Sequence, residues 1–221
     1  SSAASDVYKR QEYIVQWAEE HRSYEQKYKE QICFHMCELF GVEHINCGLM
    51  ENYSVEYTAQ KLKELCQRAG KYIIGVEPMP YSGLPNLDKA YKVVKESGCD
   101  NAMLILDTWH WVRADQPYDI LTKEIGEKVV SIQINDAYER PYAASVLRDE
   151  SMHDRLAPGT GAKDTVGFVK MIKEAGVSPR AVGVEVISDA IVAKGLKEAA
   201  SLTYDNTVKV LKEAWPELLE D

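Results

Sequence analysis

The sequence has no apolar run close to the roughly 20 residues that a membrane-spanning helix needs. Its first residues also do not follow the charged, apolar and small-residue order of a secretory signal. Positive charge is scarce, because 26 Lys and Arg residues stand against 35 Asp and Glu residues, for a net charge of −9. Nucleic acids and anionic membrane surfaces attract basic proteins, so we expect neither of them as a partner.

Cysteine is scarce and scattered. The five cysteines are an odd number, and no set of them has the spacing of a metal site. Cys33 and Cys37 share one predicted helix face, but four thiolates are assembled nowhere. We therefore expect reduced thiols in a cytoplasmic protein.

Two glycine-rich phosphate-binding signatures are absent. No Gly-x-Gly-x-x-Gly follows the first predicted strand, so nothing supports a dinucleotide-binding fold. The segment 158–161, Pro-Gly-Thr-Gly, lacks the Lys-Ser/Thr ending of a Walker loop. Because this segment leads into a predicted helix, its amides could still orient toward an anion.

Strand and helix patterns alternate from about residue 23 onward. The expected strands are residues 42–47, 73–76, 102–107, 129–134 and 181–186. The expected helices are residues 24–39, 54–69, 86–97, 115–126, 164–175 and 195–214, with glycine as the recurrent stop. A long loop separates the fourth strand from the next helix. Strand–helix units at about 30-residue spacing indicate a parallel sheet with helices outside it.

An oxygen-bearing side chain closes each of the last four strands. These side chains are Glu77, Asp107, Gln133 and Glu185. The runs before them are short and apolar, which is typical of strands buried on both faces of a parallel sheet. A carboxylate at such a position is costly unless a partner binds it. Side chains at the same end of neighbouring strands converge, so these four could hold one divalent cation.

The strand ends also bear on the fold class. An open doubly wound sheet and a (β/α)8 TIM barrel both fit the alternation, and acids on successive strand ends favour the barrel, which typically needs about 250 residues. We therefore predict an α/β TIM barrel that is N-terminally truncated to about five βα units. Residues 1–11 have no convincing period and are expected to be a non-native or disordered leader, and residues 12–221 a single partial TIM-barrel domain.

Five motifs in order resemble the xylose-isomerase-like barrel superfamily of sugar phosphate isomerases and epimerases. The resemblance covers roughly residues 30 to 213, and its motifs are Gly75–Pro80, Leu106–His110, Ile132–Ala137, His153–Gly161 and Val184–Ser188. The wider superfamily includes ketose 3-epimerases, inosose dehydratases, dehydroshikimate dehydratases and endonuclease IV. The motifs point to the superfamily and leave the substrate open.

The resemblance implies that Glu77, Asp107, Gln133 and Glu185 are the metal ligands. Most members carry His at the third position, whereas dehydroshikimate dehydratases are similar to this chain in using Gln. Asn135 has the same strand parity as Gln133 and is the rival ligand. An all-oxygen set suits Mn²⁺ or Mg²⁺ better than Zn²⁺, which prefers nitrogen and sulfur. Helix capping remains a simpler explanation for Asp107, and a cap or salt bridge for Glu77.

Three further residues are candidates for substrate binding. The resemblance assigns substrate contacts to His110 and Arg155, and a guanidinium suits a carboxylate, a phosphate or vicinal hydroxyls. Trp109 could supply an apolar wall for a sugar ring. A solvated loop position is the alternative for Arg155. For His110 the alternative is a surface position, or one that supports other site residues without touching the substrate. Arg140 and His153 are weaker candidates on the same loop as Arg155, and for both of them a solvated position is the alternative.

The expected activity is divalent-metal-dependent isomerisation or epimerisation of a ketose, keto-polyol or related sugar. Glu77 and Glu185 would pass a proton between faces of the substrate while His110 and Arg155 orient it. A dehydratase of the inosose or 3-dehydroshikimate type, with His110 as base, is the first alternative, and an inactive barrel fragment is the second. An endonuclease IV activity needs a histidine-rich zinc cluster, which five scattered histidines do not supply. Whether the chain forms a homo-oligomer is left open.

Overall fold

The structure is a computed structural model that describes residues 13–220. The predicted leader, residues 1–11, lies outside the described residues. The chain divides into two compact units, one made of residues up to Ile105 with Lys128–Val130, and the other of Leu106–Glu127 with Ser131 onward. The strands β1 to β5 follow one another in the sheet in sequence order, and the pairs β1–β2, β2–β3 and β4–β5 are parallel. This confirms the predicted α/β class with its parallel sheet.

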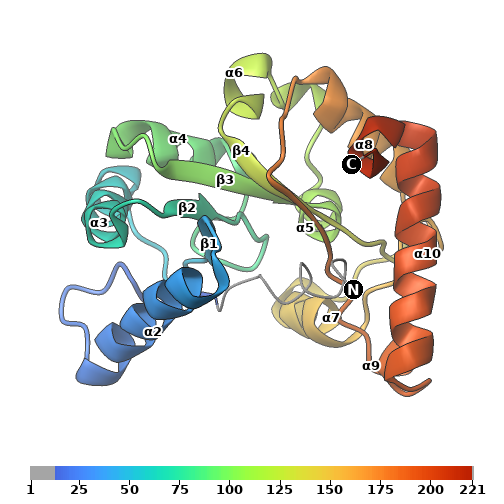
Figure 1. The fold of residues 1–221 in the computed structure, drawn as a ribbon, viewed down its shortest axis with the longest axis horizontal. Coiled ribbons are helices and arrows are strands. Elements are labelled where there is room, and N and C mark those ends of the chain that lie inside the picture. The colour runs from blue at the N-terminus through green and yellow to red at the C-terminus, as the bar shows by residue number, and fades with distance from the viewer. Residues whose placement is uncertain (1–12, 221) are drawn as a thin grey trace. The chain divides into compact units, whose positions relative to one another are not determined.

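The first unit contains the early strand–helix repeats. Its elements are α2 (Tyr24–Phe40), β1 (His44–Cys47), α3 (Val55–Ala69), β2 (Ile73–Val76), α4 (Leu87–Ser97) and most of β3 (Ala102–Asp107). Helices α3 and α4 pack against each other (Figure 1). The bounds match the predicted ones because local signals set them: Ser54 and Asn86 cap the two helices, and Gly98 ends α4 in the left-handed conformation at φ 64°.

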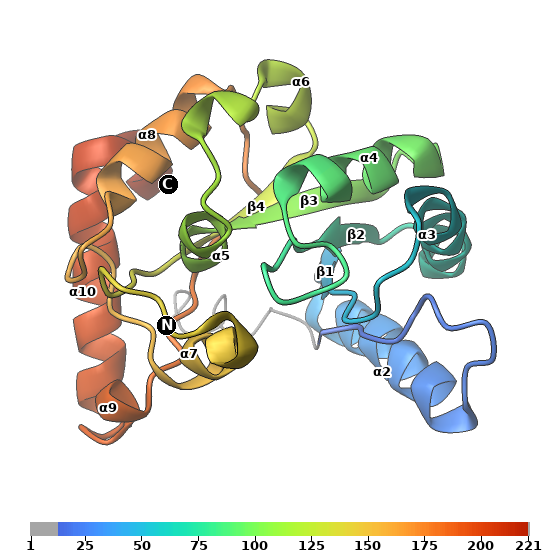
Figure 2. The same cartoon turned by 180° about the vertical axis from the view of Figure 1, so that it is seen from behind.

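The second unit contains the later elements of the fold. They are α5 (Thr108–Arg113), η1 (Tyr118–Ile120), α6 (Lys123–Gly126), most of β4 (Val129–Ile134), η2 (Ala144–Val146), α7 (Leu147–His153), α8 (Thr165–Glu174), β5 (Ala181–Val184), α9 (Asp189–Val192), α10 (Leu196–Ala214) and η3 (Pro216–Leu219). Helices α8 and α10 lie side by side, as Figure 1 and the reverse view in Figure 2 both show. The predicted loop after β4 thus includes the helix α7.

One helix prediction is wrong. The single helix expected at residues 115–126 is replaced by two short elements, η1 and α6, and a further short helix, α5, comes before them. Asp115 has a positive φ of 51° and Pro117 has φ −70° and ψ 152°, so neither residue continues a helix. Helix α5 begins directly at the end of β3, where Asp107 caps it, so Trp109 and His110 are in helical conformation.

The expectation of strands buried on both faces holds for β4 but fails for β5. All six residues of β4 are buried, whereas in β5 only Gly183 is buried and Val184 is 37% exposed. The reason is the position of β5, which ends the sheet order among the described residues. Glu185, which follows β5, is therefore closer to solvent than its apolar run predicted.

Candidate metal centre

Asp107 is the best-anchored of the predicted ligands. It ends β3 and caps α5, where Oδ1 accepts a hydrogen bond from the backbone N–H of His110 at 2.9 Å. Its Oδ2 accepts from Nδ2 of Asn135 at 2.8 Å and from Nη1 of Arg155 at 3.0 Å. The capping explanation is therefore right for Oδ1 of this buried carboxylate, and the assignment of Asp107 as a metal ligand stays a prediction that concerns Oδ2.

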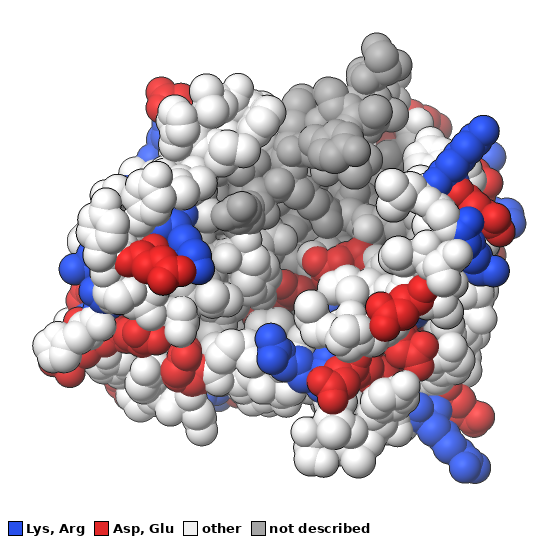
Figure 3. All heavy atoms as spheres, turned by 90° about the horizontal axis from the view of Figure 1, so that it is seen from below, with Lys and Arg blue, Asp and Glu red and all other residues white. Residues whose placement is uncertain are grey.

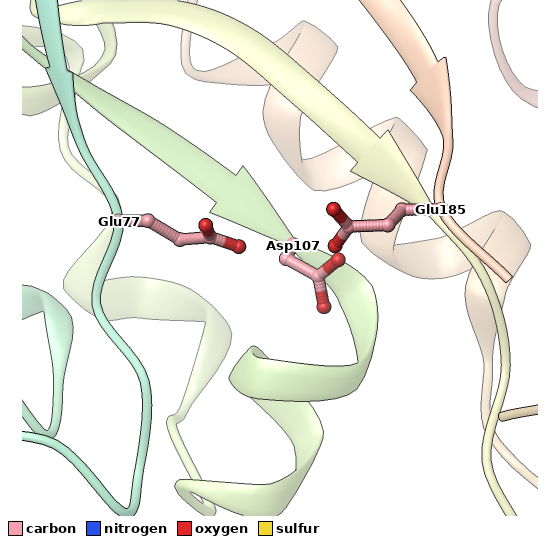
Figure 4. Close-up of side chains that lie close together, drawn as sticks. All are labelled: Glu77, Asp107 and Glu185. Carbon is pink, nitrogen blue, oxygen red and sulfur yellow. The ribbon is translucent and has the colours of Figure 1, made fainter. Parts of the chain in front are cut away.

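Glu185 lies beside Asp107, as the labelled side chains in Figure 4 show. One carboxylate oxygen from each of the two residues lies within 4.8 Å of the other. Oε2 of Glu185 accepts from Nη1 of Arg155 at 3.0 Å, and 31% of the Glu185 side chain is exposed. Two acidic side chains thus share one guanidinium at the C-terminal ends of β3 and β5, where a divalent cation could also be held.

Arg155 connects the two carboxylates to the loop that carries it. The side chain is buried, with Nη1 on Asp107 and Glu185. Its other nitrogens are fixed by Ser151, because Nε donates to the backbone oxygen and Nη2 to Oγ, both at 2.8 Å. The solvated alternative for Arg155 is therefore wrong.

His110 faces the same guanidinium. Its Nε2 lies 3.4 Å from Nη2 of Arg155, and the imidazole is buried. A guanidinium has only donors, so the nitrogen that faces it is the one that carries the lone pair. The surface alternative for His110 is therefore wrong, and its ring lies beside Arg155 inside the site.

Trp109 has a different place from the predicted sugar-stacking wall. The indole is completely buried, and its Nε1 donates to Oε1 of Glu150 at 3.2 Å. The guanidinium of Arg155 lies 5.5 Å from the ring centroid, within cation–π range. A ring that is 0% exposed cannot stack on a sugar in this structure. Trp109 instead supports Arg155, because α5 turns the indole inward as soon as β3 ends.

Gln133 and Asn135 lie two residues apart on the same face of the chain at β4. Both are buried, and among the described residues Oε1 and Nε2 of Gln133 and Oδ1 of Asn135 have no hydrogen-bond partner. Buried polar atoms are nearly always satisfied, and each exception costs about 1–3 kcal/mol. These amides sit on the strand between β3 and β5 in the sheet order, next to the carboxylate-bearing strand ends. The residues present therefore fit a bound cation with oxygen ligands.

Glu77 belongs to the first unit. It follows β2 directly, its side chain is buried, and its backbone N–H donates to the oxygen of Cys47 at 2.9 Å. Figure 4 labels it at this strand end. Pairing of Val76 with Leu104 places Glu77 one residue beyond the paired part of β2, on the strand next to β3.

The glycine-rich turn already holds an anion. Oδ2 of Asp136 accepts from the amide of Gly161 at 3.0 Å, while Oδ1 accepts from those of Ala137 and Lys163 at 2.7 and 3.3 Å. A Cβ on Gly161 would lie 2.5 Å from the Ala137 backbone oxygen, so glycine is needed there. The predicted anion-binding turn is therefore occupied by a carboxylate of the same chain. His153 and Arg140 are exposed, as the solvated alternative for them expected.

Sequence reasoning missed the residues that hold the site together. Glu150 is completely buried and accepts from Trp109, from Nε of Arg113 at 2.8 Å and from the amide of Tyr142 at 2.7 Å. Arg113 also donates to Glu150 through Nη2. Both residues look like ordinary charged positions in the sequence. No local sequence pattern could have identified this pair, because Arg113 and Glu150 lie 37 residues apart in the chain.

Both signs of charge are present on the surface of the protein. On the face drawn in Figure 3, acidic and basic side chains are interspersed. Among the described residues, no helix combines the length and the apolar character that crossing a membrane requires.

The family described as xylose isomerase-like TIM barrel matches residues 7–216. The chain belongs to this family. The fold class is therefore that of a TIM barrel, of which the described residues contain five strands.

Related proteins with curated names are isomerases and a dehydratase. An inosose isomerase of Bacillus velezensis is 29% identical over 161 residues, which are 71% of this chain and 52% of that protein. A 3-dehydroshikimate dehydratase of Pseudomonas aeruginosa is 30% identical over 121 residues, 53% of this chain and 19% of that protein. The chain thus spans about half the length of the inosose isomerases that it matches.

Solved structures show the same fold at low sequence identity. A crystal structure of the IOLI protein with a bound zinc atom has a TM-score of 0.78 at 23% identity, covering 92% of this chain and 76% of that one. An L-ribulose 3-epimerase has a TM-score of 0.59 at 14% identity, covering 91% of this chain and 74% of that one.

Proposed function

We propose that this chain carries the metal-binding strand ends of an isomerase or epimerase that acts on a small polyhydroxy ketone or keto-cyclitol. The observation that carries the proposal is the buried amide of Gln133, which has no hydrogen-bond partner among the described residues. It lies on the strand between those that end in Asp107 and Glu185. A cation would satisfy its oxygen and both carboxylates together. The curated relatives, which are sugar-related isomerases and a dehydratase, support the substrate class.

The proposed ligands are Asp107, Gln133, Glu185 and Glu77. Glu77 is included because it closes β2, the strand next to β3 in the sheet order. Three carboxylates and one amide oxygen favour Mn²⁺ or Mg²⁺ on chemical grounds. The zinc atom in the IOLI structure makes Zn²⁺ the necessary third metal in any test.

A bound divalent cation would polarise the substrate carbonyl and acidify the neighbouring carbon. The protein's own groups would then move the proton and hold the substrate. Glu185 has an exposed fraction of 31%, which leaves its carboxylate accessible to a small molecule. We assign Glu185 and Glu77 the removal and return of the proton. Nη1 and Nη2 of Arg155 and Nε2 of His110 would orient the substrate oxygens.

A dehydratase is the second candidate, because one relative is a 3-dehydroshikimate dehydratase. In this reaction a base would remove the proton next to the carbonyl, and a β-hydroxyl would then leave as water. His110 is assigned as the base of this reaction, because its buried imidazole lies beside Arg155, close to the carboxylate-bearing strand ends. The dehydrated product of dehydroshikimate is aromatic, so its ultraviolet absorbance separates this reaction from epimerisation.

The test begins with metal binding and continues with proton exchange. The protein is stripped with a chelator and titrated with Mn²⁺, Mg²⁺ and Zn²⁺, with the thermal unfolding midpoint as readout. We expect a higher midpoint with at least one metal, because a ligand that binds only the folded state stabilises it. Asp107→Asn should abolish this shift, while Asp149→Asn, the same chemical change at an exposed position in α7, should keep it.

The metal-loaded protein is then incubated in D₂O with an inosose and with 3-dehydroshikimate. We expect deuterium at the carbon next to the ketone, detected by NMR, and a loss of exchange by at least about 100-fold in Asp107→Asn. Exchange that persists unchanged in the chelated protein would contradict a metal-dependent reaction. The absence of any metal-induced shift would contradict the site itself.

A further inference from the structure

The guanidinium of Arg155 makes the same contacts that a metal ion would make. Nη1 lies 3.0 Å from Oδ2 of Asp107 and 3.0 Å from Oε2 of Glu185. It also lies 3.3 Å from the backbone oxygen of Glu185. We propose that Arg155 is the resident cation of the metal-free site, and that it competes with the divalent ion for Asp107 and Glu185. This inference rests on the metal-dependent function proposed above.

The carboxylate of Asp107 is already saturated on the side that faces the site. Oδ2 accepts from both Asn135 and Arg155, and Oδ1 accepts from the backbone of His110. A carboxylate oxygen has two lone pairs. A divalent ion that binds Oδ2 must therefore displace one of its two donors. Displacement of the cationic donor is favoured, because two positive charges a few ångströms apart repel strongly at a buried site.

The protein provides a place for the displaced arginine. Ser151 holds Nε and Nη2, and the indole of Trp109 lies under the guanidinium at 5.5 Å from its centroid. The indole would keep the guanidinium inside the site after Nη1 has left the carboxylates and Nη2 has left the hydroxyl of Ser151. The displaced nitrogen then becomes available to a substrate oxygen. Metal binding would thus precede and enable substrate binding by Arg155.

If Arg155 competes with the metal ion, a substitution that removes its charge should strengthen metal binding. If Arg155 only oriented the ligands, its removal would weaken metal binding. If it competes, Arg155→Met should bind Mn²⁺ more tightly, by about tenfold or more, because the opposing charge is gone. The metal-free variant should also melt at a lower temperature than the parent protein, since two neighbouring carboxylates lose their shared partner.

The experiment measures the Mn²⁺ dissociation constant by isothermal titration on the chelator-stripped protein. The control is Arg148→Met, which makes the same chemical change at an exposed position and should match the parent protein. Ser151→Ala is the second variant, because it keeps the guanidinium and removes only one acceptor that holds it in place. We expect about twofold to fivefold tighter binding for this variant.

The outcomes distinguish the two proposals. Tighter Mn²⁺ binding by Arg155→Met and Ser151→Ala, with Arg148→Met unchanged, supports competition, and so does binding that appears only in these two variants. Equal or weaker binding by both variants, with normal binding by the parent protein, overturns competition and leaves the metal site standing. No binding of Mn²⁺ to any of the four proteins overturns the metal site and the competition with it.

Discussion

Each of the two units contains a buried cluster of arginine and carboxylate side chains, and the two clusters differ in charge. In the first unit Glu30 accepts from Arg22 at 2.8 Å and from Nε of Arg68 at 2.7 Å, so one carboxylate has two arginines. In the second unit two carboxylates, Asp107 and Glu185, share the single Arg155. In the first cluster the charge of Glu30 is compensated by two arginines, although Nε of Arg22 has no hydrogen-bond partner among the described residues. The second has an excess negative charge, which a cation would balance.

The difference separates a structural ion pair from a binding site. Both oxygens of Glu30 are used by guanidinium groups, and the residue fixes the segment before α2 and the helix α3 to α2. The cluster at Asp107 is accompanied by the amides of Gln133 and Asn135, with buried polar atoms that lack partners among the described residues. Stability favours satisfied groups, so unsatisfied ones collected in one place indicate a ligand.

The largest loss of stability is expected when the buried pair of Glu150 and Arg113 is broken. This pair belongs to the second unit but is balanced in charge. Glu150→Gln leaves a buried guanidinium without its counter-ion, at a cost of about 3–5 kcal/mol in the free energy of unfolding. Urea denaturation measures it, with the exposed Asp149→Asn as the matched control. A loss below about 1 kcal/mol would show that this pair does not anchor the loop.

A smaller effect is expected from Glu30→Gln. The amide keeps part of the hydrogen bonding, and Arg68 is 36% exposed, so solvent screens one partner. We expect a loss of about 1–3 kcal/mol in the same urea experiment. The metal-induced rise in the melting midpoint should stay as in the parent protein. A change in that rise would contradict the distinction between the two clusters, because it would show that the Glu30 cluster affects metal binding.

The smallest effect on stability is expected from Gln133→Met, which keeps the shape of the side chain and removes the unpartnered polar atoms. The metal-free protein should gain up to about 1 kcal/mol, because a buried unsatisfied amide is replaced by an apolar group. Mn²⁺ should bind more weakly in isothermal titration. Gln60→Met, at an exposed position, should change neither quantity. A metal-free variant that is less stable than the parent would indicate that ordered water already satisfies the amide.

Much of the fold could be predicted because its signals are local. Serine and asparagine caps and glycine stops fixed α3 and α4 to within a residue, and the apolar runs located the strands. The same logic placed Asp107 at a strand end. It failed at residues 115–126, where a positive φ at Asp115 interrupts a helical pattern that the sequence supports.

The site could be predicted only in part. Strand order brings Asp107 and Glu185 to one edge of the sheet, so the pattern of strand ends was sufficient for them. Trp109 was assigned to a sugar because an aromatic after a strand end can be exposed or buried, and α5 decides which. The glycine-rich turn was assigned to a ligand, whereas Asp136 from the preceding strand end fills it.

The sequence by itself determined the order of strands and helices, the membership of the barrel family and the acids at the strand ends. The order of elements depends on hydrophobic period and capping residues, which act over a few positions, whereas the family membership rests on the resemblance of five short motifs. Only the tertiary structure decided that Arg155, 48 residues after Asp107, neutralises it, and that Glu150 holds Trp109 beneath the guanidinium. Such contacts depend on the path of a long loop, which has no periodic pattern in the sequence. Its path is set by the pairing of buried charges, because an unpaired buried charge is costly.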